Sequence, residues 1–172
     1  KTLDDFKNRR IDILLGTQMV AKGLNFPGVK LVGIVLADTG LHLPDFRSQE
    51  RTFALIVQVS GRAGRYVPDG KVIIQTYRPE NDAIRLAAAS DTGSFYAREL
   101  EIRKQLFFPP FSRILRLVFR GKNLEKVVKA AASAADRLGK ALPSSAEILG
   151  PAECPLSTIS GNSRHQLIIR TK

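Results

Sequence analysis

The sequence predicts an α/β fold in which part of a parallel sheet is followed by a small α+β domain. Three apolar runs, at residues 11–15, 30–36 and 70–76, alternate with loops and a helical stretch, as in parallel strands joined by crossover connections. Residues 107–111 (FFPPF) then form a stiff elbow, because two prolines fix their own φ angles and disfavour helix in the residue before each. A basic strand and an amphipathic helix follow. We therefore expect a first domain at 1–78, a helical linker with the elbow at 79–110, and a C-terminal α+β domain at 111–172.

The composition limits the classes of protein. The chain has 172 residues, with 27 Lys and Arg against 16 Asp and Glu, a net charge of +11, and it is 44% hydrophobic, which is globular and basic. This positive net charge favours a polyanionic partner, and nucleic acid is more favoured than a membrane. The alternative is a basic protein whose charge only keeps it soluble. With no signal peptide and no apolar run of membrane-helix length, we expect a cytoplasmic protein without membrane contact. The single Cys154 excludes an internal disulfide and a cysteine-based zinc site, and the start at Lys1 without Met suggests a piece of a longer protein.

The first domain opens with a short polar helix over residues 1–10. The apolar run at 11–15 (IDILL) predicts a strand buried in a parallel sheet, and it ends in Gly16 and Thr17. A glycine, a hydroxyl and the ammonium of Lys22 then follow at the carboxyl edge of a sheet, where open α/β sheets bind ligands. A glycine-bounded loop after a strand is also ordinary, so this pattern alone is weak.

The first domain continues with a strand at 30–36, a loop at 37–45, a helix at 46–60 and a third strand at 70–76. A Pro-Asp pair closes the loop and suits the start of the helix. Three strands are few for a doubly wound sheet, so we expect further strands upstream.

The helix of the first domain ends in residues 58–65 (QVSGRAGR). Gly61 and Gly64 let the backbone leave the helix and come close to a ligand, while Arg62 and Arg65 place two guanidinium groups on one short arc. A guanidinium group binds two phosphate oxygens at once, keeps its charge, and can stabilise the charge on a transferring phosphoryl group. The alternative is an ordinary basic helix end, since cations favour a helix C-terminus.

The remaining chain predicts two helices, the elbow, and a domain of β-α-β-β order. The helices lie at 81–89 and 92–106, and the elbow also fits a proline-rich ligand of another protein. The last domain has a strand at 114–120, a helix at 124–142 capped by Asn123 and ended by Pro143, and strands at 146–149 and 166–170 separated by a loop at 150–164.

The strand at 114–120 is predicted to have one buried apolar face and one basic face. We expect its basic face to contact DNA through three arginines: Arg113, Arg116 and Arg120. Arg164 and Arg170 are expected nearby, and a merely solvated basic face is the alternative. Neither histidine has other ligand types at metal spacing, so no metal site is predicted.

Several stretches together resemble a known family of helicases. Residues 16–27 (GTQMVAKGLNFP) resemble motif V of the superfamily-two helicases, and residues 58–65 resemble motif VI. The stretch at 36–58, the elbow, and the terminal stretch at 150–170 are similar to the primosomal replication-restart helicases. Motif VI alone is shared with many helicases, but the order of all pieces is specific. The resemblance implies the second half of a RecA-like helicase lobe, then a small α+β domain, in an ATP-dependent 3′-to-5′ DNA helicase that restarts replication at stalled forks.

The resemblance also implies roles for single residues. Arg65 is the expected arginine finger, Arg62 its companion, and Gln58 faces the triphosphate. The expected DNA-binding residues of motif V are Gly16, Thr17, Gln18 and Lys22, and the residues near the nucleotide are Gly23 and Asn25. Asn25 departs from the aspartate that the family more often has there, and an amide can bond a ribose but brings no charge.

The resemblance further implies cofactors and partners outside these residues. The family uses ATP with magnesium and binds zinc through cysteines, whereas this sequence has no Gly-x4-Gly-Lys-Ser/Thr loop, no Asp-Glu pair after a strand, and no cysteine cluster. We expect these parts upstream of Lys1, so the isolated chain is predicted to hydrolyse no ATP and to hold no cofactor. The implied partners are DNA, single-stranded-DNA-binding protein and other primosome proteins.

Three interpretations stay open from the sequence: the helicase part, a nucleic-acid-binding module without catalysis, and an unrelated α/β protein with arginines on its surface. Half a lobe is also expected to leave a sheet edge unpaired, and unpaired edges invite pairing with another chain. We therefore predict an edge-strand dimer through residues 11–15.

Overall fold

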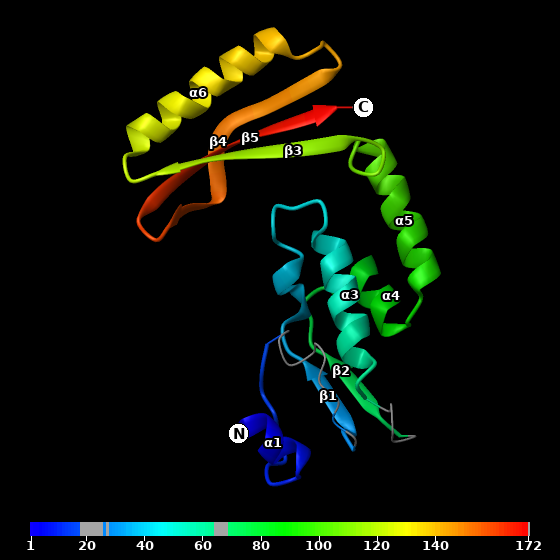
Figure 1. The fold of residues 1–172 in the computed structure, drawn as a ribbon. Helices are drawn as coiled ribbons and strands as arrows, with labels where there is room; N and C mark the ends of the chain where they lie inside the picture. Colours follow the sequence, from blue (N-terminus) through cyan, green and yellow to red (C-terminus); the bar gives the residue numbers. More distant parts are fainter. Residues whose placement is uncertain (18–25, 27, 64–68, 172) are drawn as a thin grey trace. The chain divides into compact units, whose positions relative to one another are not determined.

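The structure is a computed structural model, and it describes residues 1–17, 26, 28–63 and 69–171. The contacts divide the chain into two compact units, Lys1–Glu99 and Leu100–Lys172. Figure 1 shows the chain as a ribbon. The expected α/β class is confirmed, with a parallel sheet in the first unit and an antiparallel sheet in the second.

The first unit is a parallel β-α-β arrangement with added helices (Figure 1). Strands β1 (Leu31–Ile34) and β2 (Lys71–Ile74) pair in parallel, Leu31 opposite Lys71 and Ile34 opposite Ile74, and α3 (Ser48–Ser60) lies between them in sequence. The other elements are α1 (Thr2–Lys7), the 3-10 helix η1 (Ala37–Gly40), α4 (Asp82–Ala88) and α5 (Thr92–Gln105), in which the division between units falls. The strands and helix expected at 30–36, 46–60 and 70–76 are thus found within one to two residues of their predicted ends.

The core of the first unit lies between α3, α4 and the start of α5. Phe53 and Ile56 of α3 are buried, and the ring of Phe53 stacks on that of Phe95, with centroids 4.0 Å apart. The buried residues of α4 join the same cluster: Ala83, Ile84, Leu86 and Ala87. The helix expected in the linker therefore packs into the first unit, because its apolar face completes the core that α3 begins.

The expected strand at residues 11–15 is absent. In that segment, which lies within the described residues, no strand pairing is present, and the side chains of Ile13 and Leu15 are 85% and 89% exposed. A strand exists only where another backbone lies beside it, and a short apolar run does not by itself provide that partner. The edge-strand dimer through this segment stays a prediction, and it requires residues 11–15 to become a strand when they pair with another chain.

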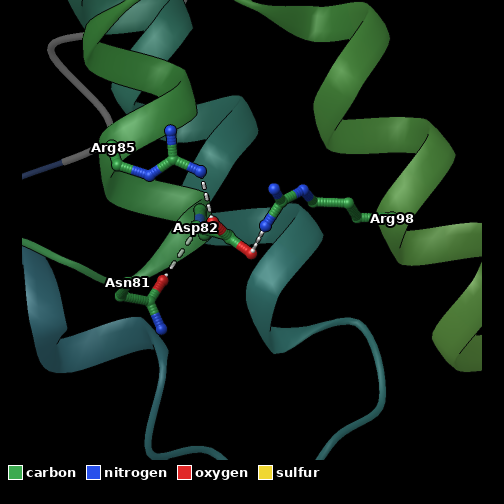
Figure 2. A network of polar contacts seen from close by, with 5 residues as sticks. Asn81, Asp82, Arg85 and Arg98 are labelled. Atoms are coloured by element: carbon green, nitrogen blue, oxygen red, sulfur yellow. Dashed lines mark hydrogen bonds and ion pairs between the residues drawn. The ribbon is translucent and has the colours of Figure 1, made fainter.

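A polar network at the start of α4 joins this helix to α5 (Figure 2). The Asn81 side chain caps α4 by accepting a hydrogen bond from the Ala83 amide at 2.9 Å. One oxygen of Asp82 accepts from Arg85 and the other from Arg98 of α5, each at 2.6 Å. These bonds, from Arg85 first and then Arg98, hold the pKa of Asp82 below its ordinary value.

The second unit is an antiparallel sheet with one helix on it (Figure 1). Strands β3 (Arg113–Gly121), β4 (Ala146–Ile159) and β5 (Asn162–Thr171) form the order β3-β5-β4, and α6 (Leu124–Ala141) packs against all three. The Asn123 side chain caps α6 by accepting from the Lys126 amide at 3.0 Å, as predicted. Leu167 of the central strand and Ala131 of α6 are fully buried beneath the helix.

The expected loop at 150–164 is wrong, because most of it is strand. Strands β4 and β5 form a hairpin closed by Ser160 and Gly161. Both residues have positive φ, as a two-residue hairpin turn requires. The prolines and glycine that suggested a loop occupy irregularities, since the register with β5 shifts between Leu149 and Ala152 and again before Thr158.

Candidate functional site

The predicted phosphate-contacting side chains of the first unit lie at the end of α3. The helix ends at Ser60 with Gly61 as its C-cap, and the chain continues for one tight turn, in which the Arg62 amide donates to Val59 O at 3.0 Å. Gln58 is exposed and Arg62 is half-buried. Because the buried side of α3 is formed by other residues, this turn carries both polar side chains at the rim of the unit.

A cavity of about 370 Å³ lies beside this turn. It is bounded by the ends of α3 and α4 and by β2, through Val57, Ser60, Gly61, Val72, Ile74, Ala88 and Ser90. The Ser60 hydroxyl is buried and has no hydrogen-bond partner within the described part of the chain. The backbone just before Arg62 thus borders a cavity and is not fully packed against other side chains.

The motif V residues are described only in part. Gly16 and Thr17 are exposed and follow residues 11–15 without strand structure. The other predicted site residues of the first unit lie outside the described residues: Gln18, Lys22, Gly23, Asn25 and Arg65. The structure therefore brings together Gln58 and Arg62 of the predicted set, and it does not test the proximity of the rest.

Asp38 is a polar site that the sequence patterns do not reveal, since they predict only a loop over residues 37–45. Asp38 is buried and lies just after β1, where its two carboxylate oxygens accept from the Thr76 hydroxyl at 2.8 Å and from the Tyr77 amide at 3.0 Å. The Tyr77 amide bond lowers the pKa of Asp38, with a smaller contribution from Thr76, against the opposing effect of burial. An acid just beyond a parallel strand was the available signal.

The three arginines predicted on β3 do not share one face. Side chains alternate along a strand, and β3 pairs with β5 without a register shift from Arg113 to Gly121. Arg116 and Arg120 therefore lie on one face, and Arg113 lies on the other, which α6 covers further along the strand. The prediction of one shared face was wrong for Arg113 because an odd separation of three residues reverses the face, whereas its contact with DNA stays a prediction.

The face of the sheet opposite α6 is basic and apolar. Besides Arg116 and Arg120 it carries the alternate residues of β5, which are Arg164, Gln166, Ile168 and Arg170. Arg116 donates to the Gln166 side chain at 2.7 Å, and Arg170 donates through Nε to Glu147 at 2.9 Å. Arg164 donates to Leu156 O at 3.2 Å, so these arginines are oriented by the chain itself.

Neither a metal cluster nor a membrane helix is found in the part of the chain that the structure describes. No group of three or more His, Cys, Asp and Glu side chains could hold a metal ion there. Within the same residues, no helix has the length and apolar character needed to cross a membrane.

Two protein families match this chain. Residues 1–67 match the Helicase conserved C-terminal domain, and residues 104–172 match the Primosomal protein N C-terminal domain. The parallel unit with its arginine-bearing turn and the sheet with one helix therefore define the class of protein, a helicase domain joined to a primosomal C-terminal domain. The expectation of a partial RecA-like lobe followed by an α+β domain is confirmed at this level.

The similar proteins are replication restart proteins named PriA. The chain is 52% identical over 170 residues to that of Treponema pallidum and 43% identical over 171 residues to that of Borreliella burgdorferi, covering 99% of the chain and 26% of each relative. The Bacillus subtilis protein is 43% identical over 172 residues, which are 100% of the chain and 21% of that relative. The chain belongs to the PriA family, and it spans about a quarter of the length of these relatives.

Proposed function

We propose that this chain forms the part of an ATP-dependent 3′-to-5′ DNA helicase of replication restart that carries an arginine finger and contacts to the DNA backbone. The observation that carries the proposal is the turn after α3, where Gln58 and Arg62 stand at the rim of a parallel β-α-β unit that matches a helicase domain. Planar guanidinium groups at such a rim are suited to the charge of a nucleotide bound by a neighbouring lobe.

In this proposal each side chain has one task. Arg65 stabilises the charge that develops on the transferring phosphoryl group, while Arg62 and Gln58 orient the triphosphate. Gly16, Thr17, Gln18 and Lys22 contact the DNA backbone, and Gly23 and Asn25 lie near the nucleotide. In the second unit Arg116 and Arg120 contact DNA from the open face of the sheet, and Arg113 contributes from its rim.

ATP with magnesium fits these residues only as the partner of a second site. The guanidinium of Arg62 suits phosphate oxygens, but the sequence contains no phosphate-binding loop to hold them. ATP supplies the phosphoryl group when it is bound, and this chain supplies charge and orientation. We therefore propose that the isolated chain hydrolyses no ATP. Zinc does not fit, since the described residues provide no cluster of ligands.

The test is a chimaera in which this chain replaces the matching 170-residue segment of the Treponema pallidum relative. We expect DNA-stimulated ATP hydrolysis from the chimaera and none from the isolated chain. Arg65→Ala should lower the rate by about three to five orders of magnitude, as for other arginine fingers, and Arg62→Ala should also lower it. Arg78→Ala, at an exposed arginine beyond β2, is the matched control and should leave the rate unchanged.

A folded chimaera that hydrolyses no ATP, or one whose rate is indifferent to Arg65→Ala, would contradict the proposal. It would favour the second candidate, a nucleic-acid-binding module without catalysis. The observation behind that candidate is the basic open face of the second unit together with the net charge of +11. Replication-protein partners such as single-stranded-DNA-binding protein belong to the first candidate and would be sought by pull-down with the active chimaera.

A further inference from the structure

A second cavity lies at the corner where β3 turns into α6. It is an open hollow of about 380 Å³ at the surface, not an enclosed cavity. Its floor is apolar, formed by Phe119, Val127 and Ala130, and its rim is cationic, formed by Arg120, Lys122 and Lys126. A sugar-phosphate unit has the same division, an apolar sugar ring beside an anionic phosphate. We call these six residues the corner pocket.

The three cations of the corner pocket are not neutralised by the protein. Within the residues that the structure describes, the side chains of Arg120, Lys122 and Lys126 make no hydrogen bond and no ion pair. Glu125, the acidic residue of the adjoining turn, instead binds Lys129 at 2.7 Å. Three uncompensated positive charges around one hollow attract an anion.

The strand register adds an independent reason to expect an anion. Arg120 lies directly opposite Arg164 of β5 on the open face of the sheet. Like charges in directly opposite positions destabilise an antiparallel pair, so this arrangement costs free energy in the unbound protein. This pair lies on the open face and not over the apolar floor of the pocket, so the phosphate that removes its repulsion and gains hydrogen bonds there is a neighbouring one of the same strand.

We infer that the corner pocket binds a backbone phosphate of a nucleic-acid strand, with the adjoining sugar over its apolar floor. The inference deepens the proposed function, because it assumes that nucleic acid is the partner of the second unit. Lys122 and Lys126 then join Arg120 as contacts, and the strand passes from the open face of the sheet round to the start of α6. A free polyphosphate offers the same chemistry, and the experiment distinguishes the two sources.

The sharpest test uses two alanines of α6. Ala130 lines the corner pocket, whereas Ala132 is exposed, lies two residues further on and thus about 200° round the helix, and is not among the pocket residues. Ala130→Glu and Ala132→Glu change the net charge equally and both sites are exposed, so both variants should fold. We expect Ala130→Glu to weaken binding of a fluorescein-labelled oligothymidylate by about tenfold, and Ala132→Glu to have a much smaller effect, measured by fluorescence anisotropy with the full chain at fixed salt.

A second pair of variants tests the cations. Replacing Arg120, Lys122 and Lys126 by Gln should make the slope of log binding constant against log salt concentration less steep by about two, since each of the three lost phosphate contacts to a single strand contributes about 0.7 to the slope. The control replaces Lys129, Arg137 and Lys140 by Gln, which removes the same charge from α6 away from the pocket. A smaller change in the control supports the corner pocket.

Three outcomes would overturn the inference. Equal losses in Ala130→Glu and Ala132→Glu would mean a diffuse charge effect. Weakened binding of tripolyphosphate by Ala130→Glu, with oligothymidylate binding unchanged, would assign the pocket to free polyphosphates. In both cases the ATPase result of the chimaera stands by itself. If the wild-type chain itself bound no DNA, the inference would fail, and so would the DNA contacts of the proposed function.

Discussion

At the level of single residues, Asp38 ties the ends of the two parallel strands of the first unit together. Its oxygens accept hydrogen bonds from Thr76 and Tyr77, which follow β2, while Asp38 itself follows β1. A four-residue strand pair has few ladder bonds of its own, so a buried carboxylate that bridges the strand ends contributes noticeably to its stability.

We expect the stability of the first unit to depend on pH through Asp38. Because the pKa of Asp38 is lowered on folding, its carboxylate stabilises the fold above the unfolded pKa of about 3.9, and this contribution is lost as the pH falls through the lower folded pKa. Asp38→Asn should lower stability at neutral pH and flatten its decline below about pH 4, measured as urea midpoints across the pH range. Thr76→Val keeps the hydrogen bond from the Tyr77 amide, so its urea midpoints should lie between those of the wild type and of Asp38→Asn. Identical pH slopes for wild type and Asp38→Asn would refute this role.

At the level of elements, β4 shows how glycine permits a strand to be irregular. Gly150 has φ +104°, and a Cβ there would lie 2.8 Å from the carbonyl oxygen of Gln166. Gly161 in the hairpin turn has φ +70°, and a Cβ there would meet nothing within 4 Å. The first position therefore needs glycine for both conformation and space, and the second for conformation alone.

This difference predicts unequal effects of the same substitution. Gly161→Ala should destabilise the second unit by about 1–2 kcal/mol, the cost of a left-handed backbone conformation for an L-residue. Gly150→Ala should cost about 1–3 kcal/mol more, because the steric clash adds to that strain. Denaturant unfolding of the two variants measures both values. Equal losses would show that the backbone near Gln166 moves freely, contrary to the close approach described.

The elements differ in how far the sequence could predict them. The helix α6 was predictable with its cap, because its apolar stripe repeats every three or four residues and Asn123 is a local signal. Residues 11–15 misled because pairing is not a local property. Only residues 146–149 of β4 were predicted as strand, because its prolines and its glycine mark register shifts as well as loops. The strand register shows that Arg113 and Arg116 lie on opposite faces of the sheet. The alternation of side chains along a strand would already have separated them in the sequence. Of the site, Gln58 and Arg62 at a helix end were predictable, and the Asp38 bridge and the corner pocket depend on contacts between distant segments.

At the level of the whole molecule, the chain has two separate cores. One lies between α3, α4 and α5, and the other lies beneath α6 on its sheet. Each core has one helix with an asparagine cap at its start, Asn81 in the first unit and Asn123 in the second. Because the buried cluster of α3, α4 and α5 draws all its described residues from the first unit, we expect the two units to unfold as separate transitions.

The two caps allow this independence to be measured. Asn81→Ala should destabilise the first unit by about 1 kcal/mol, and Asn123→Ala should destabilise the second by a similar amount, whereas the serine variants should retain most of the stability. All three tyrosines lie at or before residue 96 and there is no tryptophan, so tyrosine fluorescence reports the first unit, while circular dichroism reports both. A shift of the fluorescence transition by Asn123→Ala would contradict separate unfolding.

The irregular course of β4 has a consequence for how this protein behaves when it is concentrated. β4 is an outer strand of its sheet, and its two register shifts and its prolines at 151 and 155 break the even row of amide groups that a neighbouring molecule needs for fibril-like stacking. β3, the opposite outer strand, carries three arginines that repel a second copy. The short strands β1 and β2 have neither safeguard over most of their length, and Leu31 and Ile73 are exposed there. Aggregation of this chain is therefore expected to start in its first hundred residues and to spare its basic end.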